Sequence, residues 1–194
     1  MNKGRLEAFT DAIVAIAATI MVLELHTPKE PTMAGFWEEA PTFITYIVSF
    51  VLIYLVWYNH HNIFKKATNI TTQTYFINGI WIFWLTLIPF TTRWVGSAPN
   101  ETLPELFYTL DLFLWSLSFQ LMDHQIVKDN PDIVRDETNG FVFRAALYCT
   151  FFVAIVLAFI LPIGSLVVIG LIDAAWFFLV DRSYWHQDSG QKSF

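Results

Sequence analysis

Arg5-Leu-Glu-Ala-Phe-Thr-Asp11 leads directly into an uncharged run, Ala12-Ile-Val-Ala-Ile-Ala-Ala-Thr-Ile-Met-Val-Leu23, which ends at Glu24. The run is typical of a membrane helix, yet one arginine and two acids precede it within seven residues. Unpaired charge inside a membrane costs kilocalories per mole, so these charges need partners. The two acids and the lack of a small-x-small cleavage site disfavour a secretory signal peptide. We therefore predict a retained helix over 5–26.

The composition indicates an integral membrane protein. Of the 194 residues, 55% are hydrophobic, 18% aromatic and only 14% charged. Ala40–Phe64 and Ala67–Arg93 each exceed the roughly 20 apolar residues that cross a bilayer. A third run, Ala145–Ile172, is too long for one crossing and is interrupted by Leu161-Pro-Ile-Gly-Ser165. It predicts a tight helical hairpin that continues to Val180.

The remaining span is less apolar. Leu106–Val127 contains Asp111 and Asp123, which we expect to face protein or water. No internal repeat or long linker is visible in the 194 residues, so the chain is expected to form one domain. The prediction is an all-α integral membrane protein with six transmembrane helices, approximately over 5–26, 37–64, 69–94, 104–127, 141–161 and 164–183.

The lysines and arginines predict the orientation in the membrane. With six spans, nine of them fall on the side of the termini and two on the other side. Because basic residues accumulate in cytoplasmic loops, both termini are expected in the cytoplasm of a multi-pass cell-membrane protein. The net charge of −6 comes from acids on both sides and does not favour a nucleic-acid partner. The nine are Lys3, Arg5, Lys65, Lys66, Lys128, Arg135, Arg144, Arg182 and Lys192; the two are Lys29 and Arg93.

One face of the first helix is uniformly apolar. Its stripe includes Ile13, Ile16, Ile20 and Leu23, at the 3-4-3 spacing of a helix. Spacing alone favours packing against another helix over the lining of a narrow pore. Another face carries small residues that allow close helix approach. These are Ala8, Ala12, Ala15 and Ala18.

Two polar residues border the stripe. Thr19 lies about 100° from Ile20, so its hydroxyl either flanks the apolar wall or bonds back to the Ala15 carbonyl. Glu24 lies about 40° from Ile20 at the outer end of the helix. It either gathers cations at an outer mouth or is simply a solvated helix terminus.

The charged start of the helix predicts a structural polar network. Arg5 and Asp11 are about 120° apart and cannot pair along their own helix, so each needs other partners. Asp11 is about 140° from Ile16, which directs it away from the stripe and into the bundle. Buried polar groups are stable only when they bond one another. We expect one network of four side chains, Asp11, Trp57, His60 and Asn78.

The chain carries no motif of a membrane enzyme. It has no Gly-x-Ser-x-Gly and no His-Glu-x-x-His, its five histidines are scattered, and its single cysteine is Cys149. No catalytic activity, cofactor or metal site is therefore expected. The alternative function is proton-coupled secondary transport, in which the membrane-embedded carboxylates Asp11, Asp111 and Asp173 would relay protons. Against it, no inverted repeat is visible.

Several motifs resemble one family. Arg5-x-x-x-Phe9-Thr10-Asp11 is similar to the Arg-x-x-x-Phe-Ser-Asp signature of the transmembrane protein 175 family, which comprises lysosomal potassium channels and their prokaryotic relatives. Thr10 replaces the usual serine and keeps the hydroxyl. The likeness continues in order through the first half of the chain. It includes Ala15-Ile-Ala-Ala-Thr-Ile-Met-Val-Leu-Glu24-Leu, Tyr46-x-x-Ser49-Phe50, Trp57-x-x-His60-His61, Phe64, Asn78 and Leu85-Thr-Leu-Ile-Pro89-Phe90.

The resemblance implies a homotetrameric potassium channel whose first helices line a central pore, with one six-helix repeat per chain as in prokaryotic members. Ile16, Ile20 and Leu23 match the constriction, Thr19 lies near the ion path, and Glu24 lies at the outer mouth. The signature residues Arg5, Phe9, Thr10 and Asp11 would join Trp57, His60 and Asn78 in the structural network. The family and this chain both lack the Thr-Val-Gly-Tyr-Gly filter of ordinary potassium channels. Selection would then rest on an apolar constriction and a few hydroxyls.

Overall fold

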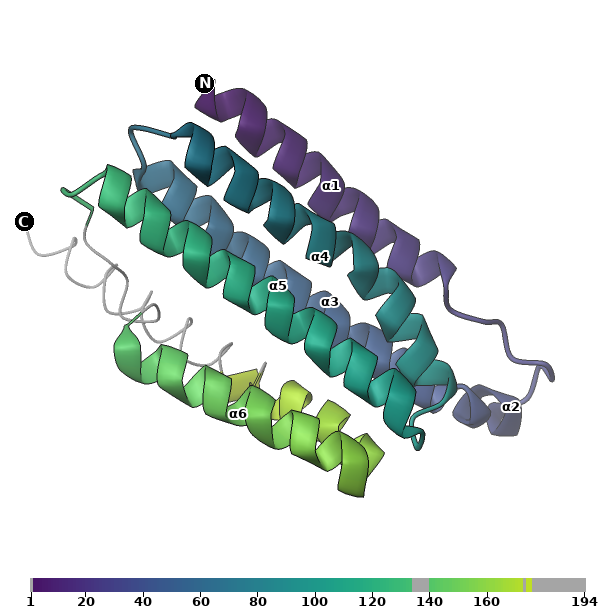
Figure 1. Cartoon of the computed structure of the whole chain (residues 1–194). Helices are drawn as coiled ribbons and strands as arrows, with labels where there is room; N and C mark the ends of the chain where they lie inside the picture. Colours follow the sequence, from purple (N-terminus) through teal and green to yellow (C-terminus); the bar gives the residue numbers. More distant parts are fainter. Residues whose placement is uncertain (1, 134–139, 173, 176–194) are drawn as a thin grey trace, which may run out of the picture.

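The computed structural model describes residues 2–133, 140–172 and 174–175, whose regular structure is entirely helical (Figure 1). Three helices, α1, α3 and α4, are long and apolar enough to cross a membrane. The long helix α5 is more polar, and its Asp111 and Asp123 are buried against protein, as predicted. The helices are α1 (Lys3–Leu23), α2 (Met33–Glu38), α3 (Ala40–Lys66), α4 (Thr72–Ser97), α5 (Thr102–Asp129), α6 (Phe141–Ile160) and a seventh, Pro162–Ile172.

The start of the second predicted helix, 37–64, is wrong, because Trp37 belongs to the separate short helix α2. The Thr32 side chain caps α2 by accepting a hydrogen bond from the Gly35 N–H at 3.1 Å. α3 then begins afresh at Ala40, with Pro41 in its first turn. Proline suits this position because its missing N–H would have no partner there.

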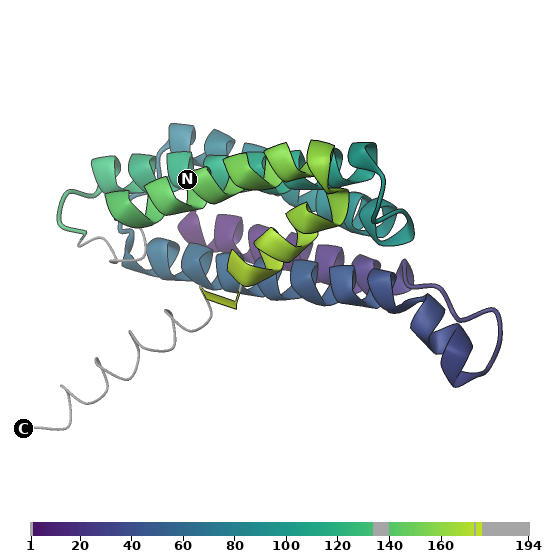
Figure 2. The same cartoon turned by 90° about the horizontal axis from the view of Figure 1, so that it is seen from below.

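The predicted break in the last apolar run is confirmed. α6 ends at Ile160, Leu161 has a non-helical backbone, and the next helix begins at Pro162. Proline disfavours continuation of the preceding helix, because it lacks the N–H and clashes with the previous turn. Figure 2 shows the chain turning back at this point. The end of the predicted helix 164–183, with Asp173 and Val180, lies outside the described residues.

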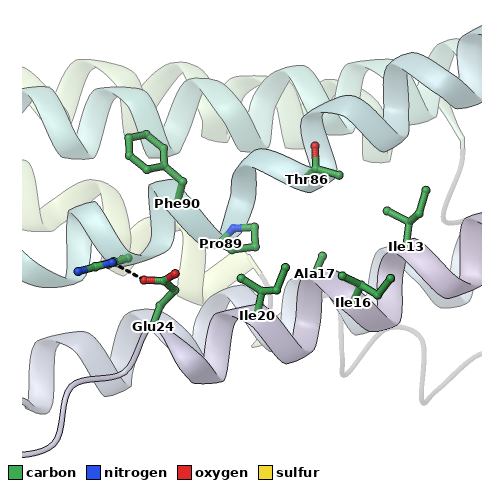
Figure 3. A pocket seen from close by; sticks show the side chains of 9 residues that line it. Ile13, Ile16, Ala17, Ile20, Glu24, Thr86, Pro89 and Phe90 are labelled. Carbon is green, nitrogen blue, oxygen red and sulfur yellow. Dashed lines mark hydrogen bonds and ion pairs between the residues drawn. The ribbon is translucent and has the colours of Figure 1, made fainter.

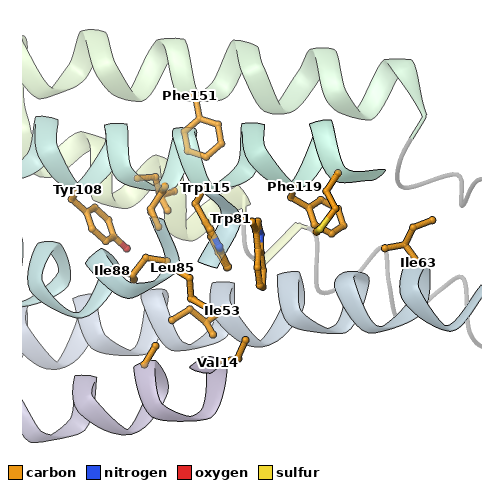
Figure 4. Close-up of a cluster of buried hydrophobic side chains, with 14 of the residues drawn as sticks. Val14, Ile53, Ile63, Trp81, Leu85, Ile88, Tyr108, Trp115, Phe119 and Phe151 are labelled. Carbon is orange, nitrogen blue, oxygen red and sulfur yellow. The ribbon is translucent and has the colours of Figure 1, made fainter. Parts of the chain in front are cut away.

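α4 is the central helix, because α1, α3 and α5 all pack against it, while α6 packs against α5 (Figure 1). Stacked aromatic rings join three of these helices. His60 of α3 lies 4.7 Å from Trp81 of α4, and Trp81 lies 5.5 Å from Trp115 of α5, measured between ring centroids. Figure 4 shows the two tryptophans face to face within the apolar core. This core orients α4, and α4 in turn supports α1.

Asn130, which caps α5, holds the loop between α3 and α4. Its Oδ1 accepts hydrogen bonds from the backbone N–H groups of Thr68 and Asn69 at 3.0 and 2.8 Å and from the Thr68 hydroxyl at 3.0 Å. Its Nδ2 donates to the carbonyls of Asn69 and Ile126 at 2.9 and 2.8 Å. One side chain thus ties three helices together at this end of the bundle.

We expect Asn130→Ala to destabilise the fold by about 2–4 kcal/mol, because each buried polar group that loses its partner costs about 1–3 kcal/mol. The apparent melting temperature of the detergent-purified protein measures the effect. Asn100→Ala is the matched control, because Asn100 is exposed just before α5 and its replacement should cost less than about 0.5 kcal/mol. Equal melting temperatures for the two variants would contradict the proposed role of Asn130.

Candidate ion pathway

Among the residues that the structure describes, the chain covers α1 on one side only. Its buried residues recur at helical spacing and face α3 and α4; they are Leu6, Thr10, Val14, Ala17 and Met21. Its other side exposes large apolar side chains. Their exposed fractions are 59% for Phe9, 55% for Ile16, 40% for Ile20 and 80% for Leu23. The residues expected at the constriction therefore lie on the surface of the single chain.

Ile16, Ile20 and Glu24 lie along one strip of α1 and share a groove with α4 (Figure 3). The groove encloses about 240 Å³. Pro89 in its α4 wall has no N–H to donate to the Leu85 carbonyl, which weakens the helix locally. The full lining is Ile13, Ile16, Ala17, Ile20, Glu24, Thr86, Pro89, Phe90 and Arg93.

Thr19 is exposed on the uncovered side of α1, beside the small residues Ala12 and Ala15. Its hydroxyl lies 3.0 Å from the Ala15 carbonyl and 2.9 Å from the Ile16 carbonyl. This is the back-bonded geometry that the sequence suggested as one alternative. Because the hydroxyl proton is directed to the helix backbone, the lone pairs of the oxygen remain available to an ion.

The expected four-residue network is divided into two separate parts. The Trp57 Nε1–H donates to the Asp11 Oδ1 at 2.8 Å. Separately, the Asn78 amide donates to the Thr10 hydroxyl at 2.9 Å, and the Asn78 Oδ1 lies 2.9 Å from the His60 Nε2. With this orientation of the amide, the His60 Nε2 carries the proton and donates it.

The expectation that Asp11 points into the bundle is wrong. Asp11 is exposed at the edge between α1 and α3, whereas its neighbour Thr10 is fully buried against α4. Adjacent residues differ by about 100° around a helix, and Thr10 has the position that faces α4. Arg5 and Phe9 also lie on the uncovered side of α1. The backbone N–H of Arg5 donates to the Asn2 side chain at 3.3 Å.

Two features near the groove were not anticipated from the sequence. Glu24 is paired with Arg93 of α4 at 2.5 Å, a pairing that the spacing of the two residues in the sequence does not indicate. Beyond Pro89, α4 is anchored by a buried polar layer: the Thr92 hydroxyl donates to Ser49 at 2.8 Å, and the Thr91 hydroxyl donates to Asp111 at 2.9 Å. Charges and hydroxyls within apolar spans signalled a need for partners, but their spacing could not identify those partners.

Residues 5–89, from the start of α1 to Pro89 in α4, match the protein family described as endosomal/lysosomal potassium channel TMEM175. A protein named potassium channel from Chryseobacterium sp. (strain P1-3) is 34% identical over 128 residues, which cover 66% of this chain and 67% of that protein. The chain belongs to the TMEM175 family. A second relative, named potassium channel from Streptomyces collinus, is 29% identical over 131 residues, covering 63% of this chain and 64% of its own length.

The fold agrees with this assignment. The crystal structure of a lysosomal potassium-selective channel TMEM175 homolog from Chamaesiphon minutus matches with a TM-score of 0.76 and 22% identity, over 91% of this chain and 96% of that one. The fold similarity therefore extends beyond residues 5–89 into the second half of the chain. The predicted resemblance to the TMEM175 family is confirmed, and the matched range includes Arg5–Asp11.

Proposed function

We propose that this chain is a potassium-preferring cation channel that conducts passively through a homotetrameric pore lined by α1, and that it catalyses no reaction. The potassium-channel names of its TMEM175 relatives support the ion, and the uncovered face of α1 supports the pathway. Six helices per chain would cross the cell membrane, with both termini in the cytoplasm. The permeant ion is K⁺, and no cofactor is required.

The observation that carries the proposal is the mixed character of the uncovered α1 face. Arg5, Ile16 and Leu23 lie within about 20° of one another around the helix, and Thr19 is exposed nearby. A face of large apolar residues alone would be compatible with lipid. A charged residue and a hydroxyl on the same face favour water or protein over lipid, because polar groups avoid the hydrocarbon region. The face therefore suits water and further copies of the chain.

In this proposal Ile16, Ile20 and Leu23 form apolar rings that narrow the pore and gate it by dewetting. The Thr19 hydroxyls stabilise partly dehydrated ions between the rings. Potassium loses its hydration shell at a lower cost than sodium, so a narrow apolar passage favours it without a cage of carbonyls. The buried Thr10, Asn78 and His60 would hold α1 in register with the bundle.

Proton-coupled transport by Asp11, Asp111 and Asp173 has less support. Asp11 lies at the level of Asn78 on α4, whereas Asp111 accepts a hydrogen bond from Thr91, 13 residues further along that helix. The two carboxylates are thus separated by about 20 Å along the bundle, far beyond direct proton transfer. Asp173 lies outside the described residues.

Reversal potentials test the function directly. Purified protein in planar bilayers, with potassium on one side and sodium on the other, should give a cation current that reverses toward the potassium equilibrium potential. The detergent-stable mass should be four times the 22.4 kDa of the chain. The absence of a cation current, or a reversal potential that indicates equal permeability to potassium and sodium, would overturn the proposal.

We expect Thr19→Val to reduce the potassium-to-sodium permeability ratio by about twofold to tenfold, because a hydrogen-bond-type contact contributes about 0.5–1.5 kcal/mol. Valine has the same shape as threonine, so packing is kept. Thr150→Val is the matched control: the Thr150 hydroxyl also bonds its own helix, to the Ala146 carbonyl at 2.8 Å, but lies on α6. An unchanged ratio in Thr19→Val, or an equal change in Thr150→Val, would remove Thr19 from the selectivity mechanism.

A further inference from the structure

Glu24 lies at one end of the groove between α1 and α4 (Figure 3), and Arg93, which also lines the groove, pairs with it. The Arg93 Nη1 lies 2.5 Å from the Glu24 Oε2, and the two side chains are 50% and 31% exposed. Glu24 caps the C-terminus of α1, and Arg93 lies in the last turns of α4. The pair therefore joins the far ends of these two helices where the bundle meets water.

This ion pair contributes little to the stability of the fold, because exposed pairs contribute about 0–1 kcal/mol. Its effect on the local charge is larger. The C-terminus of α1 carries about half a negative charge from its helix dipole, and Glu24 adds a full one. Arg93 compensates most of this sum. With Arg93 present, the end of α1 thus carries only about half a negative charge, and without Arg93 it carries about one and a half.

We propose that Arg93 controls how strongly the outer mouth of the pore attracts cations, by neutralising Glu24. The inference rests on the proposed function, in which α1 lines the pore. Glu24 follows Ile16 and Ile20 at intervals of four residues on the same strip of α1. It lies about 6 Å along the axis beyond Ile20, within the Debye length of about 8 Å at physiological ionic strength.

Fourfold assembly multiplies the effect. Four unpaired carboxylates around one axis would concentrate potassium at the entrance, because clefts lined by one sign of charge focus the field. Four carboxylates paired with guanidinium groups attract potassium only weakly. Arg93 is therefore a conductance-determining residue that need not contact the ion. Removal of Arg93 should increase the potassium conductance. Removal of Glu24 should leave the Arg93 side chains unpaired at the mouth, and their positive charge should decrease the conductance.

The test is the single-channel potassium conductance of the full-length protein in planar bilayers at 10 mM and 1 M KCl. At 10 mM, where the Debye length is about 30 Å, Arg93→Gln should raise conductance at least about twofold and Glu24→Gln should lower it similarly. The double variant should be close to wild type. At 1 M, where the Debye length is about 3 Å, the four proteins should converge.

Lys29→Gln is the matched control, because Lys29 is an exposed cation in the same connection after α1 and its replacement changes the net charge by the same amount. Its conductance at 10 mM KCl should change much less than that of Arg93→Gln. Melting temperature and detergent-stable mass of each variant show whether the assembly is intact. These measurements separate an electrostatic effect from a loss of folding.

The opposite signs of the two single variants are the decisive result. If both change conductance in the same direction, or by the same factor at 10 mM and 1 M, the pair is a mechanical link between α1 and α4 and the inference is overturned. A wild-type protein with no potassium current would overturn the channel function itself, and the inference with it. A conducting wild type with unchanged variants would overturn the inference alone.

Discussion

Ile16→Asn should raise the potassium conductance about tenfold and reduce the preference for potassium over sodium. Ile16 is 55% exposed on the uncovered face of α1, so little packing within the chain is lost. In the proposed tetramer, four asparagine amides would replace four apolar side chains at the constriction. Water would then fill the passage and ions would keep more of their hydration shells. Tenfold corresponds to about 1.4 kcal/mol of barrier.

Single-channel conductance and reversal potential in planar bilayers measure both effects. Ile47→Asn is the matched control, since Ile47 has 56% exposure on α3 and the substitution is identical. It should leave the permeability ratio unchanged. If Ile16→Asn conducts and selects as the wild type does, Ile16 is a packing residue and the pore lies elsewhere.

Asn78→Leu should have the largest effect on assembly. Asn78 is fully buried on α4, and its amide is the direct connection between Thr10 of α1 and His60 of α3. Leucine has a similar size, but it leaves both partners without their hydrogen bond. Each buried polar group that loses its partner costs about 1–3 kcal/mol, so a loss of about 2–6 kcal/mol is expected. α1 would then no longer be held in register with the bundle.

The apparent melting temperature and the fraction of intact oligomer in detergent report this loss. Gln73→Leu, an exposed polar-to-apolar change five residues earlier on α4, should alter stability by less than about 0.5 kcal/mol. If Asn78→Leu and Gln73→Leu melt alike, the contacts of Asn78 do not hold α1 in place. His60→Leu should resemble Asn78→Leu, because it removes the other end of the same connection.

Some structural features followed from local chemistry and were therefore predictable. The composition indicated a membrane protein, and Pro162 placed the break between α6 and the next helix. The charge of Asp111 and Asp123 implied that they face protein or water, and the structure buries both against protein. Helix α2 was missed, because six residues capped by Thr32 carry too little periodicity to be distinguished from a loop.

The polar network shows why directions around a helix were harder to predict. Helical angles separate Asp11 from Ile16, but they do not reveal where α4 lies. The structure places Thr10 against Asn78 and leaves Asp11 at the surface with Trp57. An angle between two residues of one helix is a local quantity, whereas the partner's position depends on packing of residues distant in sequence. The pairing of Glu24 with Arg93 could not be predicted for the same reason, because these residues are distant in sequence and meet only through packing.

By itself the sequence determined that the chain lies in a membrane, that it has long apolar helices and that it carries the TMEM175 motifs. Hydrophobicity, helical period and motif spacing are properties of neighbouring residues. The tertiary structure decided which face of α1 is covered, which charges are paired and which polar groups are buried. Those outcomes depend on α4, which packs against three helices at once. The apolar stripe that includes Ile16 has the same sequence pattern whether it packs against another helix or lines a pore. Its exposure in the fold supports pore lining.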